Sequence, residues 1–169
     1  MYEKFGELDS AEEINRCAAA QKQEGDVQAL ISLAKENGLD EEDAKDYAEG
    51  LMDELCNPLT AALGKLEIEC AEYKIKGVLL DWVNELKQMA MESEEFAIAI
   101  RRKGKGLDGY IAKTADRGYK ERCIVDSRIV NKTTIRGAIG NNEFSIGIPD
   151  RKTRRELAEE YYLGKEGAK

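Results

Sequence analysis

Histidine is absent from this chain, and its absence limits the chemistry that the residues can perform. The 169 residues include 34 acidic residues, 26 basic residues and four cysteines. Without an imidazole, the Ser-His-Asp and Cys-His nucleophile systems are excluded, and only carboxylate or lysine chemistry remains. The four cysteines are separated by 39, 14 and 53 positions. This spacing matches no metal-binding or redox motif and predicts buried, reduced thiols.

Paired carboxylates, such as Asp53 with Glu54 and Glu159 with Glu160, are the remaining candidates for catalysis. Side chains one or two positions apart on a helix do not face each other, so these pairs do not converge on one substrate. We therefore expect a protein that is not an enzyme, with no catalytic residue, no metal and no cofactor. An enzyme would require carboxylates together with an added metal ion.

The densest acidic segment spans residues 36–54, where nine carboxylates accompany the single Lys45. Acidic residues in the first turn of a helix complement its dipole, so a solvated helix face is one explanation. Carboxylates three or four positions apart repel each other, however, and selection for stability alone favours lysines between them. Contact with a basic groove, or mimicry of phosphate, is the second explanation. The candidate partner-binding residues are Glu36, Asp40, Glu41, Glu42, Asp43, Asp46, Glu49, Asp53 and Glu54.

A first basic cluster follows at Arg101, Arg102, Lys103 and Lys105. Its two glycines do not have the spacing of a nucleotide-binding loop. Cations are favourable at a helix C-terminus, which is one reason for the cluster. Contact with nucleic acid or with a protein is the other.

A second basic cluster comprises Arg151, Lys152, Arg154 and Arg155. It falls in the first turn of the last predicted helix, where the helix dipole disfavours cations. This placement favours contact with a nucleic acid or a protein partner.

The charge of the chain is divided along its length. Residues 1–100 hold 24 acidic and 9 basic residues, a net charge of −15, whereas residues 101–169 hold 10 and 17, a net charge of +7. Such an asymmetry predicts that the two parts meet different partners, or partly each other. No stretch has the roughly eighteen apolar residues of a membrane span, and the first residues do not resemble a signal peptide. We expect a cytoplasmic protein without membrane contact, whose oligomeric state the sequence leaves open.

Helices must position most of these residues. Capping residues and apolar positions at helical spacing predict helices that begin after Ser10, Asp26, Asp40, Asn57, Gly77, Ser93, Gly106 and Asp150. β-Branched residues and glycines then gather between the last two helices, and Gly140-Asn141-Asn142 has the composition of a hairpin turn.

These elements predict a mainly α (α+β) fold, a multi-helix bundle with a small C-terminal β-hairpin at about residues 133–148. We expect two subdomains, an acidic helical one at residues 1–76 and a second at 77–169 that contains the hairpin and the C-terminal helix.

The order of several short segments resembles two families from mobile genetic elements. The second half of the chain resembles the PcfK-like family of conjugative elements and phages of gut bacteria, through Asp81-Trp82, Ser93–Ala97, Arg102–Leu107, Tyr110-Ile111, Val125-Asp126 and Glu160–Tyr162. The first half is similar to a clostridial family that includes a type II-A anti-CRISPR protein, through Ser10–Asn15, Ala34–Gly38 and Leu55–Leu59.

The resemblance implies an anti-CRISPR protein that binds the Cas9–guide RNA complex in the bacterial cytoplasm and interferes with DNA binding or cleavage. An acidic protein can enter a cleft that accommodates nucleic-acid phosphates. The alternative is a nucleic-acid-associated accessory protein of a conjugative element, which acts through the two basic clusters.

Overall fold

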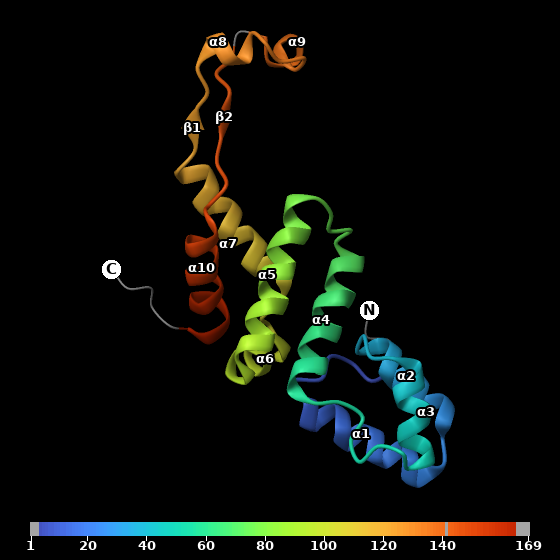
Figure 1. Cartoon of the computed structure of the whole chain (residues 1–169). Helices are drawn as coiled ribbons and strands as arrows, with labels where there is room; N and C mark the ends of the chain where they lie inside the picture. Colours follow the sequence, from blue (N-terminus) through green and yellow to red (C-terminus); the bar gives the residue numbers. More distant parts are fainter. Residues whose placement is uncertain (1–3, 141, 165–169) are drawn as a thin grey trace.

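The computed structural model describes residues 4–140 and 142–164. Over these residues the chain forms ten helices and one two-stranded antiparallel sheet. Figure 1 shows helices in two groups and a thin extension that carries the two strands. The prediction of a mainly helical bundle with a small β-hairpin is confirmed. Within the described part of the chain, no helix combines the length and the apolarity that crossing a bilayer requires.

Three helices form the N-terminal lobe: α1 (Ala11–Glu24), α2 (Val27–Glu36) and α3 (Glu41–Glu49). The side chains of Ser10, Asp26 and Asp40 each accept a backbone N–H from the first turn of the helix that follows. These caps satisfy donors that the helix itself leaves unpaired. The three helix starts that the sequence predicts in this lobe are therefore confirmed.

Five helices form the second group, the bundle: α4 (Pro58–Glu72), α5 (Val78–Glu92), α6 (Glu94–Arg101), α7 (Leu107–Lys120) and α10 (Arg151–Leu163). Asn57 and Thr60 form a reciprocal capping box at the start of α4. The apolar faces of the five helices meet in a buried cluster that includes Trp82, Phe96 and Tyr162. This cluster buries Val83 and Leu86 of α5 completely.

Helix α4 contributes to both hydrophobic clusters of the molecule. Its Ala61 belongs to the cluster of the N-terminal lobe, whereas the adjacent Ala62 and Leu66 belong to the cluster of the bundle. The two groups of helices thus share one element. The subdomain boundary that the sequence places between residues 76 and 77 remains a prediction.

The arm, residues 121–148, leaves the bundle between α7 and α10 and extends away from it (Figure 1). It contains β1 (Cys123–Ile124), α8 (Ser127–Val130), α9 (Arg136–Ile139) and β2 (Ser145–Ile146). The strands pair antiparallel, with Cys123 opposite Ile146 and Ile124 opposite Ser145. Gly118 and Gly147 cross at the base of the arm, where a Cβ on either glycine would lie closer than 3.0 Å to the backbone of the other.

The predicted position of the hairpin, about residues 133–148, is wrong. The first strand lies earlier, at Cys123–Ile124, and two short helices occupy much of the connection between the strands. Asp126 begins the first of them because its side chain accepts the backbone N–H of Arg128 at 2.7 Å. A local capping contact thus takes precedence over the β-branched composition of the segment. Asn141, from the predicted turn, lies outside the described residues.

Candidate functional site

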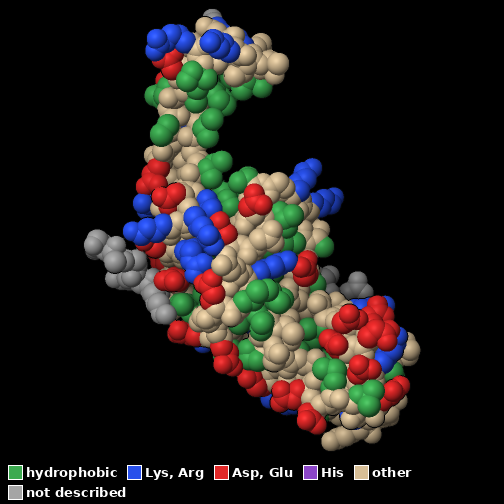
Figure 2. Space-filling model, viewed as in Figure 1, with side chains coloured by type: hydrophobic (Ala, Val, Ile, Leu, Met, Phe, Trp, Pro, Cys, Tyr) green, Lys and Arg blue, Asp and Glu red, His purple; other side chains and the backbone are tan. Residues whose placement is uncertain are grey.

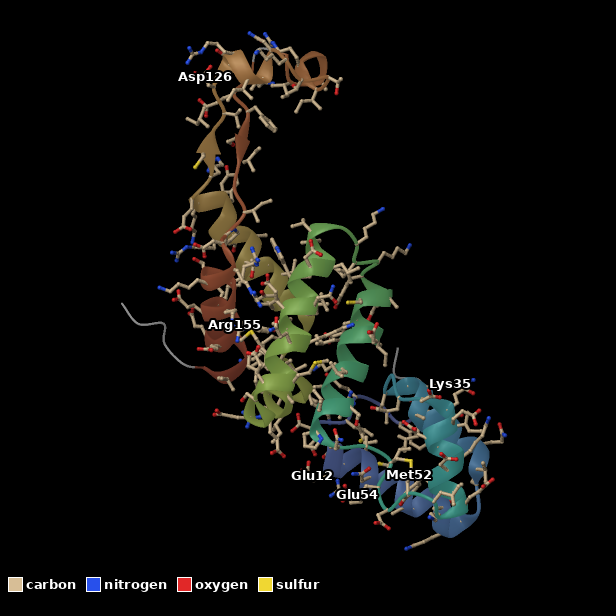
Figure 3. The ribbon with its side chains drawn as sticks, viewed as in Figure 1. Glu12, Lys35, Met52, Glu54, Asp126 and Arg155 are labelled. Carbon is tan, nitrogen blue, oxygen red and sulfur yellow. The ribbon has the colours of Figure 1, made fainter. Side chains whose placement is uncertain are left out.

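The acidic surface comprises the nine carboxylates predicted between residues 36 and 54, and it covers the lobe that holds α2 and α3. Figure 2 shows acidic side chains gathered over this end of the molecule, and Figure 3 labels Lys35 and Glu54 at opposite ends of the lobe. The chain reverses between α2 and α3 through Gly38, which has a φ of 69°. The reversal places carboxylates from α2, α3 and the following loop on one lobe.

Four of these carboxylates make contacts inside the lobe. Glu36 accepts the backbone N–H groups of Lys4 and Phe5 at 2.8 and 3.0 Å. Asp40 caps α3, while Glu41 and Glu42 pair with Lys35 and Lys45 at 3.0 and 2.5 Å. Asp40 therefore caps α3, and Glu41 and Glu42 lie in its first turn, where acidic side chains complement the helix dipole. This is the first of the two explanations for the acidic segment.

The other five carboxylates of the acidic surface make no such contacts with the described residues. Within residues 4–140 and 142–164, the side chains of Asp43, Asp46, Glu49, Asp53 and Glu54 have no hydrogen bond or ion pair. Glu49, Asp53 and Glu54 are exposed, and Asp43 and Asp46 are half-buried. Their mutual repulsion is therefore not offset by internal cations, and they present a concentrated negative potential to the solvent.

The first basic cluster does not form one accessible patch. Arg101 is only 1% exposed. Its Nε donates to the carbonyl oxygen of Leu8 at 3.1 Å, Nη1 donates to that of Ala61 at 3.5 Å, and Nη2 donates to Oδ1 of Asn37. The expectation that Arg101 lies at a contact surface is wrong, because its guanidinium joins the bundle to the N-terminal lobe.

The remaining residues of this cluster are divided between solvent and internal contacts. Arg102 and Lys103 are exposed. Lys105 is half-buried, and its Nζ donates to the carbonyl oxygen of Tyr161 at 2.7 Å and lies 5.1 Å from the centre of that ring. Two cations are thus available to a partner at this position, rather than four.

The second basic cluster attaches α10 to α5. Arg154 forms a bidentate salt bridge with Glu85, with N–O distances of 2.9 and 2.5 Å. Arg151 donates to Gln88 at 2.7 Å. Figure 3 shows Arg155 on α10, and its guanidinium donates to the Glu92 carboxylate at 2.6 Å and lowers the pKa of that carboxyl. Acceptors along one face of α5 explain why arginines occupy the first turn of α10, where the helix dipole disfavours them.

We expect the Glu85–Arg154 pair to stabilise the fold measurably. Its side chains are 16% and 13% exposed, so water screens the pair little and loss of either partner leaves a charge in a partly desolvated site. A double-mutant cycle with Glu85→Ala and Arg154→Ala should give a coupling energy of about 1–3 kcal/mol in urea unfolding.

The Lys152–Glu156 pair provides the control, because its side chains are 86% and 56% exposed and 3.8 Å apart. The same cycle on this pair should give less than about 0.5 kcal/mol. Equal coupling energies for the two pairs would contradict an anchoring role for Arg154.

The thiols and carboxylates of the described residues form no metal centre. Among these residues, no group of three or more Cys, Asp or Glu side chains is placed to hold a metal ion. Burial raises the pKa of the Cys56 thiol to about 12, so this thiol stays protonated at neutral pH. Desolvation likewise raises the pKa of Glu69, whose carboxylate accepts the backbone N–H of Leu107 at 2.9 Å.

The arm carries surface residues that the sequence analysis did not select. Its outer end holds Arg128, Lys132 and Arg136, all exposed, and its length exposes several isoleucines. The signal was present in the sequence, because residues 127–140 contain three cations at four-residue spacing and no acidic residue. The hairpin predicted for this region placed its isoleucines in strands. A run of cations at helical spacing was therefore not expected there.

The described residues thus form a helical protein with an acidic surface and an extended arm. Several arginines of its basic clusters, such as Arg101 and Arg154, bond to groups within the protein. Comparison of the chain with models of protein families, with curated proteins and with solved structures gives no match.

Proposed function

We propose that this chain is a stoichiometric binding protein, not an enzyme, and that its acidic surface docks on a basic, phosphate-binding surface of another macromolecule. The observation that supports the proposal is the group of five carboxylates without internal partners, Asp43, Asp46, Glu49, Asp53 and Glu54. Complementary potentials accelerate association and suppress wrong partners. A surface of this kind suits a cleft that otherwise holds nucleic acid.

The partner that we propose is the Cas9–guide RNA complex, in line with the resemblance of the sequence to anti-CRISPR and PcfK-like proteins. Such a complex holds its heteroduplex in a positively charged channel and stabilises the displaced strand through cations. Carboxylates of this chain that pair with those basic side chains would interfere with DNA binding or with cleavage. In this proposal the protein inhibits by stoichiometric binding through complementary charge, and it catalyses no reaction.

The alternative, a nucleic-acid-associated accessory protein that acts through the two basic clusters, has less support. Arg101 is buried, and Arg151, Arg154 and Arg155 contact α5. Arg102, Lys103 and Lys152 are exposed, and within the described part of the chain they have no hydrogen bond to α5. Salt-sensitive binding to DNA or RNA without Cas9, lost when these three become alanine, would favour the alternative.

A charge reversal tests the acidic surface directly. The triple variant Asp43→Lys, Asp46→Lys, Glu49→Lys should keep its helicity in circular dichroism, because lysine is a good helix former. It should lose inhibition of DNA cleavage by a purified Cas9–guide complex, since three attractive charges become repulsive. Addition of the chain before and after the DNA separates a block of DNA binding from a block of cleavage.

A matched control keeps the same change of net charge at other places. Glu72, Asp116 and Glu159 are exposed residues on α4, α7 and α10, and their joint replacement by lysine should leave inhibition intact. Equal loss in both triple variants would assign the effect to net charge alone. If the unmodified chain in molar excess neither co-migrates with the complex nor reduces cleavage, Cas9 is not the partner.

A further inference from the structure

The arm has too little buried surface to explain its conformation by itself. Of its described residues, Val130 alone is buried. The two strands share a two-residue pairing, extended by one hydrogen bond from the N–H of Val125 to the carbonyl oxygen of Phe144 at 2.8 Å. Isolated two-stranded hairpins are marginal in water unless another element covers one face. The arm is therefore incomplete as a structural unit.

Isoleucines form the uncovered part of the arm. The exposed fractions are 65% for Ile124, 59% for Ile129, 42% for Ile135, 51% for Ile146 and 55% for Ile148. Several large apolar side chains within one narrow extension are unusual on a monomer and typical of a protein–protein interface. A phosphate backbone would not cover them.

The end of the arm is also basic. We define the basic tip as Arg128, Lys132 and Arg136, in a stretch from 127 to 140 that contains no acidic residue. Figure 2 shows basic side chains at this end. Asp126 pairs with Arg128 at 2.8 Å, and Figure 3 places Asp126 where β1 meets the tip. Asp126 compensates the charge of Arg128, whereas Lys132 and Arg136 have no ion pair among the described residues and keep the tip positive. The surface that complements the arm is therefore acidic as well as partly apolar.

The acidic surface of this chain has both properties. It carries nine carboxylates, of which only Glu41 and Glu42 form ion pairs within the described residues, and Leu51, within the same segment, is 71% exposed. The arm and the acidic surface lie at opposite ends of the molecule (Figure 1). The arm therefore does not reach the acidic surface of its own chain, although the two surfaces are complementary in charge.

We propose that the arm docks on the acidic surface of a second copy of this chain. Two copies in antiparallel orientation bring each basic tip onto the acidic surface of the other, and the two-fold symmetry closes the assembly as a dimer. Each contact combines cations against carboxylates with isoleucines against Leu51. The dimer covers the surface assigned to a basic partner under the proposed function, so that binding such a partner competes with self-association.

The first test is the mass in solution. Analytical ultracentrifugation of the full chain at low salt should give twice 18.9 kDa, with dissociation on dilution. Arg128→Glu, Lys132→Glu, Arg136→Glu, the tip-reversed variant, should be a monomer. Asp43→Lys, Asp46→Lys, Glu49→Lys, the surface-reversed variant, should also be a monomer, since like charges then meet in both homodimers.

A mixture of the two variants supplies the decisive measurement. The acidic tip of one chain then meets the lysines of the other, and the basic tip of the second meets the carboxylates of the first. Both contacts are attractive again, so the mixture should form a heterodimer, which also shows that both variants are folded. A wild-type monomer at all concentrations, or reversed variants that still form homodimers, would overturn the proposal.

Two further outcomes separate the alternatives. A dimer that resists both charge reversals but is lost in Ile124→Ser, Ile146→Ser would mean that the arms pack on each other, which overturns the acidic surface as the site. A wild-type monomer whose tip binds duplex DNA would assign the arm to nucleic acid instead. The tip-reversed variant should still inhibit Cas9 if only the dimer proposal fails, and no variant should inhibit if only the proposed function fails.

Discussion

Replacement of Arg101 with methionine should lower the free energy of unfolding by about 3–5 kcal/mol, because three buried acceptors each lose a hydrogen bond at a cost of about 1–3 kcal/mol. Arg101 is 1% exposed and ends α6, yet its guanidinium contacts the N-terminal segment, the end of α2 and α4. Methionine fills a similar volume but donates no hydrogen bond. The side chain of Asn37 and the carbonyl oxygens of Leu8 and Ala61 lose a donor in a site that excludes water.

Arg101→Lys should recover only part of this loss. Lysine keeps the positive charge, but a single ammonium group does not reproduce the planar fork that spans three acceptors. Urea unfolding followed by circular dichroism measures both changes.

The neighbouring arginine is the control for this experiment. Arg102 is exposed, so Arg102→Met should change the free energy of unfolding by no more than about 0.5 kcal/mol. If Arg101→Met costs less than about 1 kcal/mol, the guanidinium does not hold the lobe to the bundle.

Gly64→Ala should also destabilise the protein, although it lies in the middle of a helix where alanine is normally better. Helix propensity favours alanine over glycine by about 1 kcal/mol. A Cβ at position 64, however, would lie closer than 3.0 Å to the carbonyl oxygen of Asn37. That atom belongs to the backbone, and it adjoins Gly38, which has a φ of 69° and its own close approach to Gly64. The end of α2 must therefore move away from α4.

Overpacking of this kind costs about 1–3 kcal/mol, occasionally more. We expect a net loss near the upper end, about 3 kcal/mol, because backbone relaxes less readily than a side chain. Gly137→Ala supplies the control, since Gly137 lies in the short helix α9 and a Cβ there meets nothing within 4 Å. Its unfolding midpoint should stay the same or rise. If Gly64→Ala had the same unfolding midpoint as the unmodified protein, the end of α2 would accommodate the added Cβ without loss of stability.

The helices could be predicted from the sequence because their start and stop signals are local. Ser93 caps α6 by accepting the N–H of Phe96, and Asp150 caps α10 by accepting that of Thr153. Each contact involves residues three positions apart, so neighbouring letters of the sequence contain the information. The apolar stripes that follow these caps then fix the buried face of each helix.

The strands could not be placed in the same way. Cys123 pairs with Ile146 across more than twenty intervening residues, and a two-residue strand has no periodicity of its own. Composition indicated a hairpin in this region, and a small sheet is present. Its position depends on the Asp126 cap and on the crossing of Gly118 with Gly147, which bring together distant parts of the chain.

The acidic surface and the basic clusters show what a charge pattern does and does not reveal. The acidic segment lies on one lobe because consecutive elements carry it. The fate of the arginines depended on acceptors elsewhere, such as Glu85 on α5 for Arg154 and Asn37 for Arg101. Exposure of a cation is a tertiary property, and the sequence around it does not determine it.

The shared position of α4 also bears on how this chain can change by recombination. Ala61 completes one core, while Ala62 and Leu66 complete the other. A genetic exchange that joins either half to a foreign sequence must therefore carry this helix to both descendants, or leave one of them with an open core. We expect the two halves to be inherited as a unit.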